Sequence, residues 1–229
     1  MIEEPPILTI NSAPRRADAA QIAAFQGVPT GFVVDAMKGG AALDRDIRPI
    51  LDKAGQIAGS ALTADCGPGD ILASLAALAV IRPGDIVVAA FGGFQGCAAA
   101  GDRLCGMMKN NGAAGFVTDG PVRDHAGIIA IGLPVWATGL TPESPFSKGP
   151  GSVGFPVQIG GRQIESGDMI VADCDGVVVV PFARIDAVIA ALKSVRHREA
   201  DLDRQVKDGL RIPPAIAALL DSDAVSRSG

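Results

Sequence analysis

Histidine is scarce in this sequence of 229 residues, and its scarcity limits the catalytic chemistry open to the chain. With only His125 and His197, a Ser-His-Asp triad or a histidine-based metal site lacks its parts, and no serine stands in a G-x-S-x-G turn. The six lysines fall in turns or polar segments, whereas a Schiff-base lysine needs a desolvated pocket that lowers its pKa. Carboxylate, arginine and glycine chemistry remains.

A disulfide framework, a signal peptide and a membrane span are also missing. The four cysteines form no C-x-x-C pair, so we expect buried or half-buried thiols in a reducing compartment rather than a disulfide frame or zinc site. The start MIEEPPILTI lacks the basic region of a signal peptide, and the longest apolar run, residues 71–81, is too short to span a bilayer. We expect a soluble, cytoplasmic protein without a membrane partner.

No basic patch interleaved with aromatic residues occurs, and the net charge is −5 with a pI near 5.0. The chain therefore has no general attraction to nucleic acid or to an anionic membrane. A composition of 48% hydrophobic and 20% charged residues is typical of a globular protein. At this length we expect a single domain over residues 1–229.

Segments of strand and helix type alternate along the chain and predict an α/β domain with a mixed, layered sheet. Helices are expected at residues 19–25, with Asp18 as N-cap, in PTGFVVDAMKGG and in GDILASLAALAVIRPGD. Strands are expected in GQIAGSALTAD, GFVTDG and LPVWATG, and a hairpin in FPVQIGGRQIESGD. The segments PGDIVVAAF and SGDMIVADCDGVVVVP each join a Gly-Asp turn to a continuous β-branched run, which is typical of a strand buried on both faces.

A long amphipathic helix is expected near the C-terminus, from about residue 183 to residue 208. Its apolar positions are spaced alternately by four and three residues, and Glu199 interrupts them; they are Val188, Leu192, Val195, Leu202 and Val206. Either this apolar seam ends early and the end of the helix is solvated, or the helix packs on another subunit and brings Glu199 to a polar site there.

The segment GFVTDGPVRDHAGIIAIG places Asp119, Arg123 and Asp124 in a turn between an apolar strand and an apolar helix. In one interpretation Asp124 caps the helix and Arg123 forms a surface ion pair. In the other, Arg123 binds an anionic substrate beside a cation that Asp124 holds. The planar guanidinium suits a carboxylate, and an all-oxygen site with few protein ligands suits Mg²⁺ or Mn²⁺. The position at a strand end favours the second interpretation.

Two glycine-containing segments are further candidates. GDRLCGMMKNNG predicts a helix that places Gly101 and Asp102 at its N-terminus, where free N–H groups form an anion site, unless Asp102 is simply the N-cap. FGGFQG follows a buried strand but lacks the G-x-G-x-x-G spacing of a dinucleotide site, so its glycines are better explained by tight turns.

The segments GDRL, GAAGFVTDGPVRD, LPVWATGLTPESP, VQIGGRQIESGD and VADCDGVVVVP resemble the superfamily of proteins like the regulator of ribonuclease activity A (RraA). Within it they most resemble the class II 4-hydroxy-4-methyl-2-oxoglutarate / 4-carboxy-4-hydroxy-2-oxoadipate aldolases, over about residues 28–180. The resemblance implies an α-β-β-α sandwich like the swivelling phosphohistidine domain. It also implies homotrimers or homohexamers with active sites between subunits.

Aldolases of this family release pyruvate from a small 2-oxo acid and also decarboxylate oxaloacetate, with Mg²⁺ or Mn²⁺. Carried over by motif, Asp124 would ligate the metal directly, with Asp102 and a neighbouring subunit's Glu199 acting through water. Arg123 would bind substrate oxygens. The substrate carboxylate would be held by the amides of Gly101, Asp102, Arg103 and Leu104. His125 stands where the family often has an aliphatic residue, which leaves the preferred substrate open.

Two rival functions accompany the resemblance. Some members of the superfamily inhibit ribonuclease E by protein contact, without turnover. The presence of Asp102, Arg123 and Asp124 together favours the enzyme. A methyltransferase of menaquinone synthesis is disfavoured because the chain shows no convincing adenosylmethionine-binding pattern.

Overall fold

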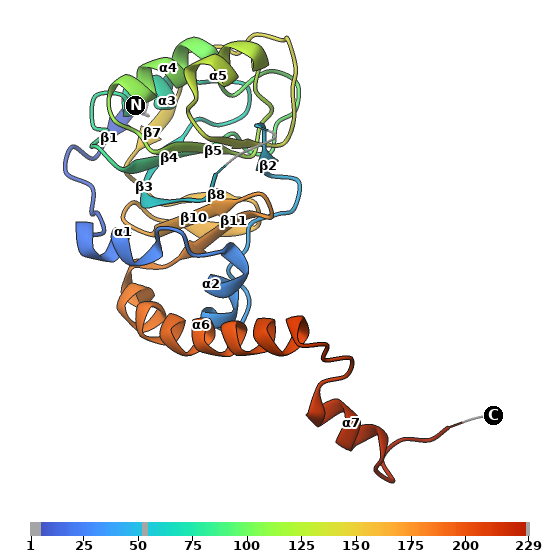
Figure 1. The fold of residues 1–229 in the computed structure, drawn as a ribbon. Helices are drawn as coiled ribbons and strands as arrows, with labels where there is room; N and C mark the ends of the chain where they lie inside the picture. The colour runs from blue at the N-terminus through green and yellow to red at the C-terminus, as the bar shows by residue number, and fades with distance from the viewer. Residues whose placement is uncertain (1–5, 52–54, 228–229) are drawn as a thin grey trace, which may run out of the picture.

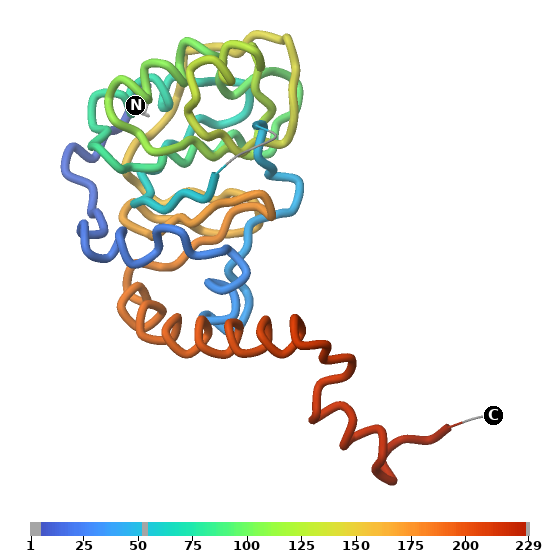
Figure 2. Tube along the Cα trace, in the orientation of Figure 1, coloured from blue at the N-terminus to red at the C-terminus, as the bar shows by residue number. Residues whose placement is uncertain are grey.

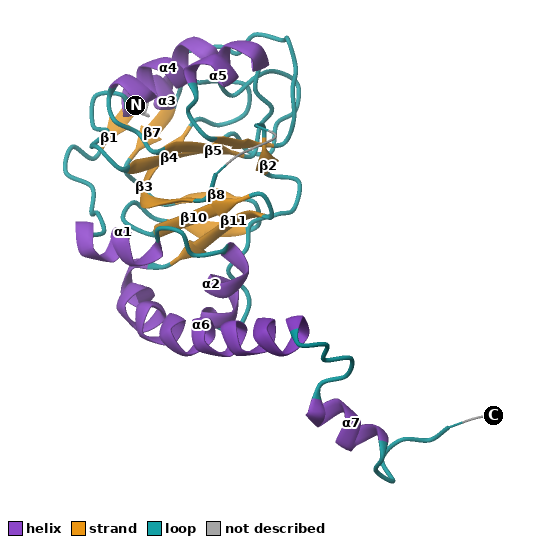
Figure 3. Ribbon diagram, in the orientation of Figure 1, coloured by secondary structure: helices purple, strands orange, loops and turns teal. Residues whose placement is uncertain are grey.

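Four layers stack in the order helix, sheet, sheet, helix (Figure 3) in the computed structural model, which describes residues 6–51 and 55–227. The first sheet layer contains β3 (Ile57–Asp65), β4 (Asp85–Ala90), β5 (Gly115–Thr118) and β6 (Val135–Ala137), and its outer face is covered by α3 (Leu72–Ala77), α4 (Asp102–Asn110) and α5 (His125–Ile131). The second contains the hairpins β8 (Val157–Ile159)–β9 (Arg162–Ile164) and β10 (Met169–Asp173)–β11 (Gly176–Val180). The outer face of β10–β11 is covered by α1 (Ala19–Phe25), α2 (Thr30–Met37) and α6 (Ile185–Lys207).

Alternating side chains of the central strands account for the layers, because successive residues of a strand point to opposite faces. In β4, Val87 and Ala89 pack against the helices, whereas Ile86 and Val88 face the second sheet. All six residues of β4 are buried, so the prediction of a strand covered on both faces is confirmed there.

Strand β3 belongs to both sheet layers. It pairs antiparallel with β10 from Ile57 to Ser60 and parallel with β4 from Ser60 to Asp65. Gly59 lies at this crossing, where a Cβ atom would be 2.4 Å from the carbonyl oxygen of Gly84 and 2.9 Å from Cγ1 of Ile86. The two layers therefore approach each other at a position that has room only for glycine.

The strands that follow β3 are parallel, in the order β3-β4-β5-β6, so their carboxyl ends share one edge. Ligands of α/β proteins bind at such an edge, and the loops leading to α4 and α5 lie there. The sheet is completed by short edge strands, which are β1 (Leu8–Ile10), β2 (Arg48–Pro49) and β7 (Gly151–Val153).

Among the predicted helices and strands, several are confirmed and two differ from the structure. Helix α1 begins with a capping box in which Asp18 accepts from the amide of Gln21. The expected single strand in SGDMIVADCDGVVVVP is instead the hairpin β10–β11, because Cys174 and Asp175 form a turn. Helix α3 is shorter than expected and ends at Ala77.

The cysteine expectation holds for three of the four residues. Cys66, Cys97 and Cys105 are buried, and burial raises the pKa of Cys66 to about 11 and that of Cys105 to about 12, as expected of unreactive thiols. Cys174 is exposed in the β10–β11 turn, contrary to expectation. None of the helices in the described residues has the length and apolar character needed to cross a membrane. The acidic start of the sequence, residues 1–5, lies outside the residues that the structure describes.

Helix α6 packs on the domain along only part of its length. Val188, Leu192 and Val195 are buried, whereas Leu202 and Val206 are 43% and 57% exposed. Past α6 the chain leads to α7 (Pro214–Leu220), which was not predicted and projects away from the sandwich (Figures 1 and 2). Within the chain, nothing described covers the second half of the apolar seam.

Replacing Gly59 with alanine tests the crossing of β3 between the layers. The added Cβ meets a backbone oxygen that cannot move freely, so we expect the free energy of unfolding to fall by about 1–3 kcal/mol. Denaturant unfolding measures this change. The matched control is Gly31→Ala on α2, where no heavy atom lies within 4 Å of the new Cβ. Equal stability of the two variants would show that the approach at Gly59 is not tight.

Candidate functional site

The loop before α4 and the loop before α5 run side by side and bring the sequence candidates together. Val122 forms isolated β-bridges with Ala100 and with Leu140. The amide of Arg123 donates to the carbonyl of Ala100 at 3.0 Å. The Arg-Asp turn therefore lies beside the N-terminus of α4.

Gly101 allows the Arg-Asp turn to approach α4 closely. A Cβ at Gly101 would lie 2.6 Å from Oδ2 of Asp124 and 3.1 Å from Cγ of Arg123. A second glycine, Gly127 in the first turn of α5, allows the Asp102 side chain to approach α5 closely. A Cβ at Gly127 would lie 2.6 Å from Oδ2 of Asp102. The Asp124 carboxylate thus lies against the glycine at the start of α4, and the Asp102 carboxylate lies against the glycine in the first turn of α5.

Asp124 occupies the N-cap position of α5 but does not cap it. Its backbone is left-handed, with φ 58° and ψ 44°, and its side chain makes no capping hydrogen bond. Its Oδ2 lies 3.4 Å from Nε of Arg123, and the two side chains are 45% and 36% exposed. An exposed pair of this kind adds little stability, and left-handed backbone is unfavourable for most residues. The surface ion pair exists, but the capping interpretation is wrong.

Asp102 is not an N-cap either, because Gly101 occupies that position and Asp102 is the first residue of α4. Its Oδ1 accepts from the amide of Arg103 at 2.6 Å. Among the described residues, the amides of Gly101, Asp102 and Leu104 have no acceptor. These free N–H groups and the positive end of the helix dipole are the features on which the predicted anion site depends, and the site itself stays a prediction.

A cavity of about 370 Å³ joins these groups. It has room for a small organic acid, and its walls combine the polar groups with apolar side chains. It is lined by Ile71, Leu75, Ala100, Gly101, Asp102, Arg103, Leu104, Met107, Arg123, Asp124 and Pro145. All predicted site residues except Glu199 are in this set. Its two carboxylates, Asp102 and Asp124, are oxygen donors that suit a hard divalent cation with a partly aqueous shell.

Glu199 is not part of this cavity. It is half-buried on α6, and α6 lies in the outer helical layer opposite to α4 and α5 (Figure 1). Within a single chain Glu199 cannot reach the Arg-Asp turn, so its role across a subunit boundary stays a prediction.

Two polar neighbours of the Arg-Asp pair have structural roles. Asp119 accepts from the amides of Phe91 and Gly93 at 2.6 and 2.8 Å and so fastens the FGGFQG loop to the end of β5. Burial raises the pKa of the Asp119 carboxyl, although these amide donors oppose the shift. Nε2 of His125 lies 2.9 Å from the carbonyl oxygen of Ile50.

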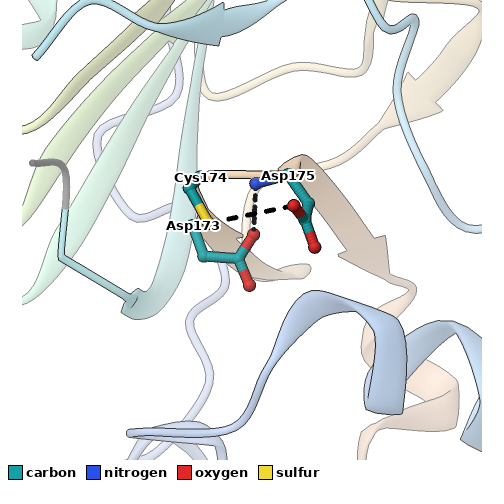
Figure 4. Close-up of side chains that lie close together, drawn as sticks. All are labelled: Asp173, Cys174 and Asp175. Atoms are coloured by element: carbon teal, nitrogen blue, oxygen red, sulfur yellow. Dashed lines mark hydrogen bonds between the residues drawn. The ribbon is translucent and has the colours of Figure 1, made fainter. Parts of the chain in front are cut away.

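A second acidic cluster, formed by Asp173, Cys174 and Asp175, lies in the β10–β11 turn (Figure 4). The Asp173 carboxylate accepts from the amide and hydroxyl of Thr30, at 2.8 and 2.9 Å, and from the amide of Asp175 at 2.9 Å. These bonds cap α2 and shape the turn. Both carboxylate oxygens of Asp173 thus already accept hydrogen bonds, whereas the ligand oxygens of a cation site need free lone pairs.

Sequence reasoning missed Ser144, whose hydroxyl accepts from Nη1 of Arg123 at 2.6 Å. Ser144 lies 21 residues from Arg123, in the loop between β6 and β7, and no local sequence pattern connects the two.

Comparison with known proteins gives consistent matches. The sequence profile of the RraA-like family, described as Aldolase/RraA, matches residues 30–179. A relative from Halalkalibacterium halodurans, named "Putative 4-hydroxy-4-methyl-2-oxoglutarate aldolase", is 34% identical over 90% of this chain and 96% of its own.

Solved structures agree in fold. An uncharacterized protein from Pseudomonas syringae pv. tomato superposes with a TM-score of 0.77 at 23% identity, over 87% of this chain and 93% of the other, which is a likeness of fold alone. An unusual member of the RNase ES inhibitor RraA protein family from Streptomyces coelicolor superposes with a TM-score of 0.72 at 27% identity, over 83% of this chain and 98% of the other.

Replacing Gly127 with alanine tests how Asp102 is placed. The new Cβ would displace the Asp102 carboxylate, so we expect Mn²⁺ binding, measured by calorimetric titration, to weaken at least about tenfold, as when a group that orients a metal site is lost. The control is Gly106→Ala on α4, where the added Cβ meets Cδ1 of Ile131 at an ordinary 3.5 Å. Unchanged Mn²⁺ binding in both variants would contradict the contact between Asp102 and α5.

Proposed function

The chain belongs to the RraA-like family, and we propose that it is a divalent-metal-dependent class II aldolase. Its substrate is 4-hydroxy-4-methyl-2-oxoglutarate or 4-carboxy-4-hydroxy-2-oxoadipate, which it cleaves to pyruvate and a second 2-oxo acid. The observation that carries the proposal is the meeting of Arg123 and Asp124 with the N-terminus of α4 in one cavity. The name of the Halalkalibacterium halodurans relative supports it.

The donor set fits Mg²⁺ or Mn²⁺. Asp124 would hold the cation directly and Asp102 would hold it through water, since both carboxylates line the cavity and a small hard cation keeps much of its hydration. When bound, such a cation would supply a Lewis acid for the 2-oxo group, where negative charge develops as the carbon–carbon bond breaks.

The chain's own residues bind the substrate and stabilise the charge. The free amides at the start of α4 bind the 2-oxo acid's carboxylate. Arg123 adds a fixed positive charge beside the enolate oxygen of the pyruvate half, where it stabilises the product side of the bond cleavage. The described lysines, at positions 38, 109, 148, 193 and 207, are all exposed and lack the desolvation that a Schiff-base mechanism needs.

Oxaloacetate decarboxylation is proposed as a side activity. Loss of carbon dioxide from oxaloacetate leaves the same pyruvate enolate as the aldol cleavage, so the same guanidinium and the same anion site serve both reactions.

The alternative function is a protein-binding regulator of ribonuclease E. It is favoured by the likeness to the inhibitor-family structure from Streptomyces coelicolor. A regulator that acts by protein contact has no need of a cavity that gathers Asp102, Arg123 and Asp124, so we favour the enzyme. We further propose a cytoplasmic homotrimer or homohexamer. The likeness of the sandwich to the swivelling phosphohistidine domain stays a prediction.

The first test is an assay of the purified protein for pyruvate release. With Mg²⁺ or Mn²⁺ we expect pyruvate from both the branched 4-hydroxy-2-oxo acids and oxaloacetate, and no release after thorough EDTA treatment until metal is returned. Borohydride should trap no lysine adduct with the substrate. Activity that survives EDTA, or a trapped adduct, would refute the metal mechanism, and absence of turnover on every substrate would favour the regulator.

The second test concerns Glu199. We expect Glu199→Ala and Asp124→Asn each to inactivate the enzyme, because Glu199 completes a neighbouring subunit's site. Asparagine is chosen at position 124 because it tolerates the left-handed backbone there. Mixed oligomers of the two variants should then regain part of the activity, since some sites receive both intact residues. If native mass spectrometry confirms mixing and activity stays absent, Glu199 does not act across the interface.

A further inference from the structure

Arg123 is held from two sides in the structure. Its Nε faces Oδ2 of Asp124 at 3.4 Å, and its Nη1 donates to the hydroxyl of Ser144 at 2.6 Å. Nη2 has no acceptor among the described residues. Because a guanidinium is planar and rigid, fixing Nε and Nη1 also fixes the direction of Nη2.

The loop that carries Ser144 is itself fastened. On one side of Ser144, the carbonyl of Glu143 accepts from the amide of Ala98 at 3.1 Å. On the other side, Phe146 donates to Gly69 at 2.8 Å and accepts from Ile71 at 2.9 Å. Ser144 thus lies between two anchor points, although its own side chain is exposed.

The buried carboxylate of Asp70 reinforces the second anchor. Asp70 is 8% exposed, and it accepts from the amides of Leu72, Lys148 and Gly149 at 2.7, 2.6 and 3.0 Å. It therefore joins the start of α3 to the end of the Ser144 loop. The proposed reaction does not use Asp70, so its burial is explained by this fastening.

We propose that Ser144 is a positioning residue that orients the Arg123 guanidinium toward the substrate, and that Asp70 fixes the loop from which Ser144 acts. This inference rests on the proposed aldolase function. A long arginine side chain that is free in solution loses conformational entropy when it grips a ligand. Holding it in place beforehand removes that cost and places Nη2 where charge develops in the transition state.

The Ser144 loop contains its own matched control. Ser147 lies three residues further along, is also exposed, and makes no hydrogen bond among those of the described residues. We expect Ser144→Ala to lower kcat for oxaloacetate decarboxylation about tenfold, less than the roughly hundredfold or greater loss expected for Arg123→Lys. Ser147→Ala should match the wild type, and Ser144→Thr, which keeps the hydroxyl, should recover most of the loss. The melting temperature should stay unchanged throughout.

A second readout needs no turnover. The Nε–H resonance of Arg123 in the metal-free protein is identified by its loss in Arg123→Lys. In Ser144→Ala this resonance should shift and exchange faster with water, whereas in Ser147→Ala it should not change. Equal kcat in Ser144→Ala and Ser147→Ala, failure of Ser144→Thr to recover activity, or an unchanged resonance in Ser144→Ala would each overturn the role of Ser144.

The two readouts separate this inference from the function on which it rests. If the wild type releases no pyruvate, the aldolase proposal fails, and with it the claim that Ser144 orients Arg123 for catalysis. If the wild type is active, Arg123→Lys is impaired and Ser144→Ala is not, only the inference about Ser144 fails.

Discussion

The pairing of β3 with both β4 and β10 is the constraint on which the rest of the structure depends. One strand fixes the separation and the relative direction of the two sheets, and Gly59 permits their close approach. A buried ion pair reinforces the same region: Arg16 donates through Nε and Nη2 to Asp85 at the start of β4, at 2.9–3.0 Å. With β3 and β4 held in this way, the ends of the parallel strands and the loops beyond them have a fixed frame.

The candidate site depends on that frame through close backbone contacts rather than through a dense polar network. Gly101 and Gly127 let two carboxylates lie against the starts of two helices. The positive end of α4 then faces the cavity where an anion is proposed to bind. Residues that depart from ordinary conformational preference lie where the chemistry is proposed. They are an aspartate with left-handed backbone and glycines at the starts of helices.

Local patterns predicted much of this structure. A β-branched run identified β4, and Asp18 identified the start of α1. The Arg-Asp turn and the start of α4 could be proposed as one site only through the resemblance to the aldolase family, because the two segments are about 20 residues apart and no local pattern joins them. The turn at Cys174 was missed because a continuous β-branched run on both sides hides it. The contact between Ser144 and Arg123 could not be predicted, since it depends on a loop that the distant Asp70 carboxylate and Ala98 amide hold in place.

The left-handed backbone at Asp124 also limits which residues can stand there. Glycine, asparagine and aspartate adopt this conformation most readily, and aspartate alone among them carries a negative charge. Glutamate would offer the same carboxylate on a longer side chain but would fit the backbone poorly. The turn therefore favours aspartate over glutamate wherever a carboxylate is needed at this position. A search for proteins with the same chemistry can therefore look for an aspartate with left-handed backbone directly before a helix.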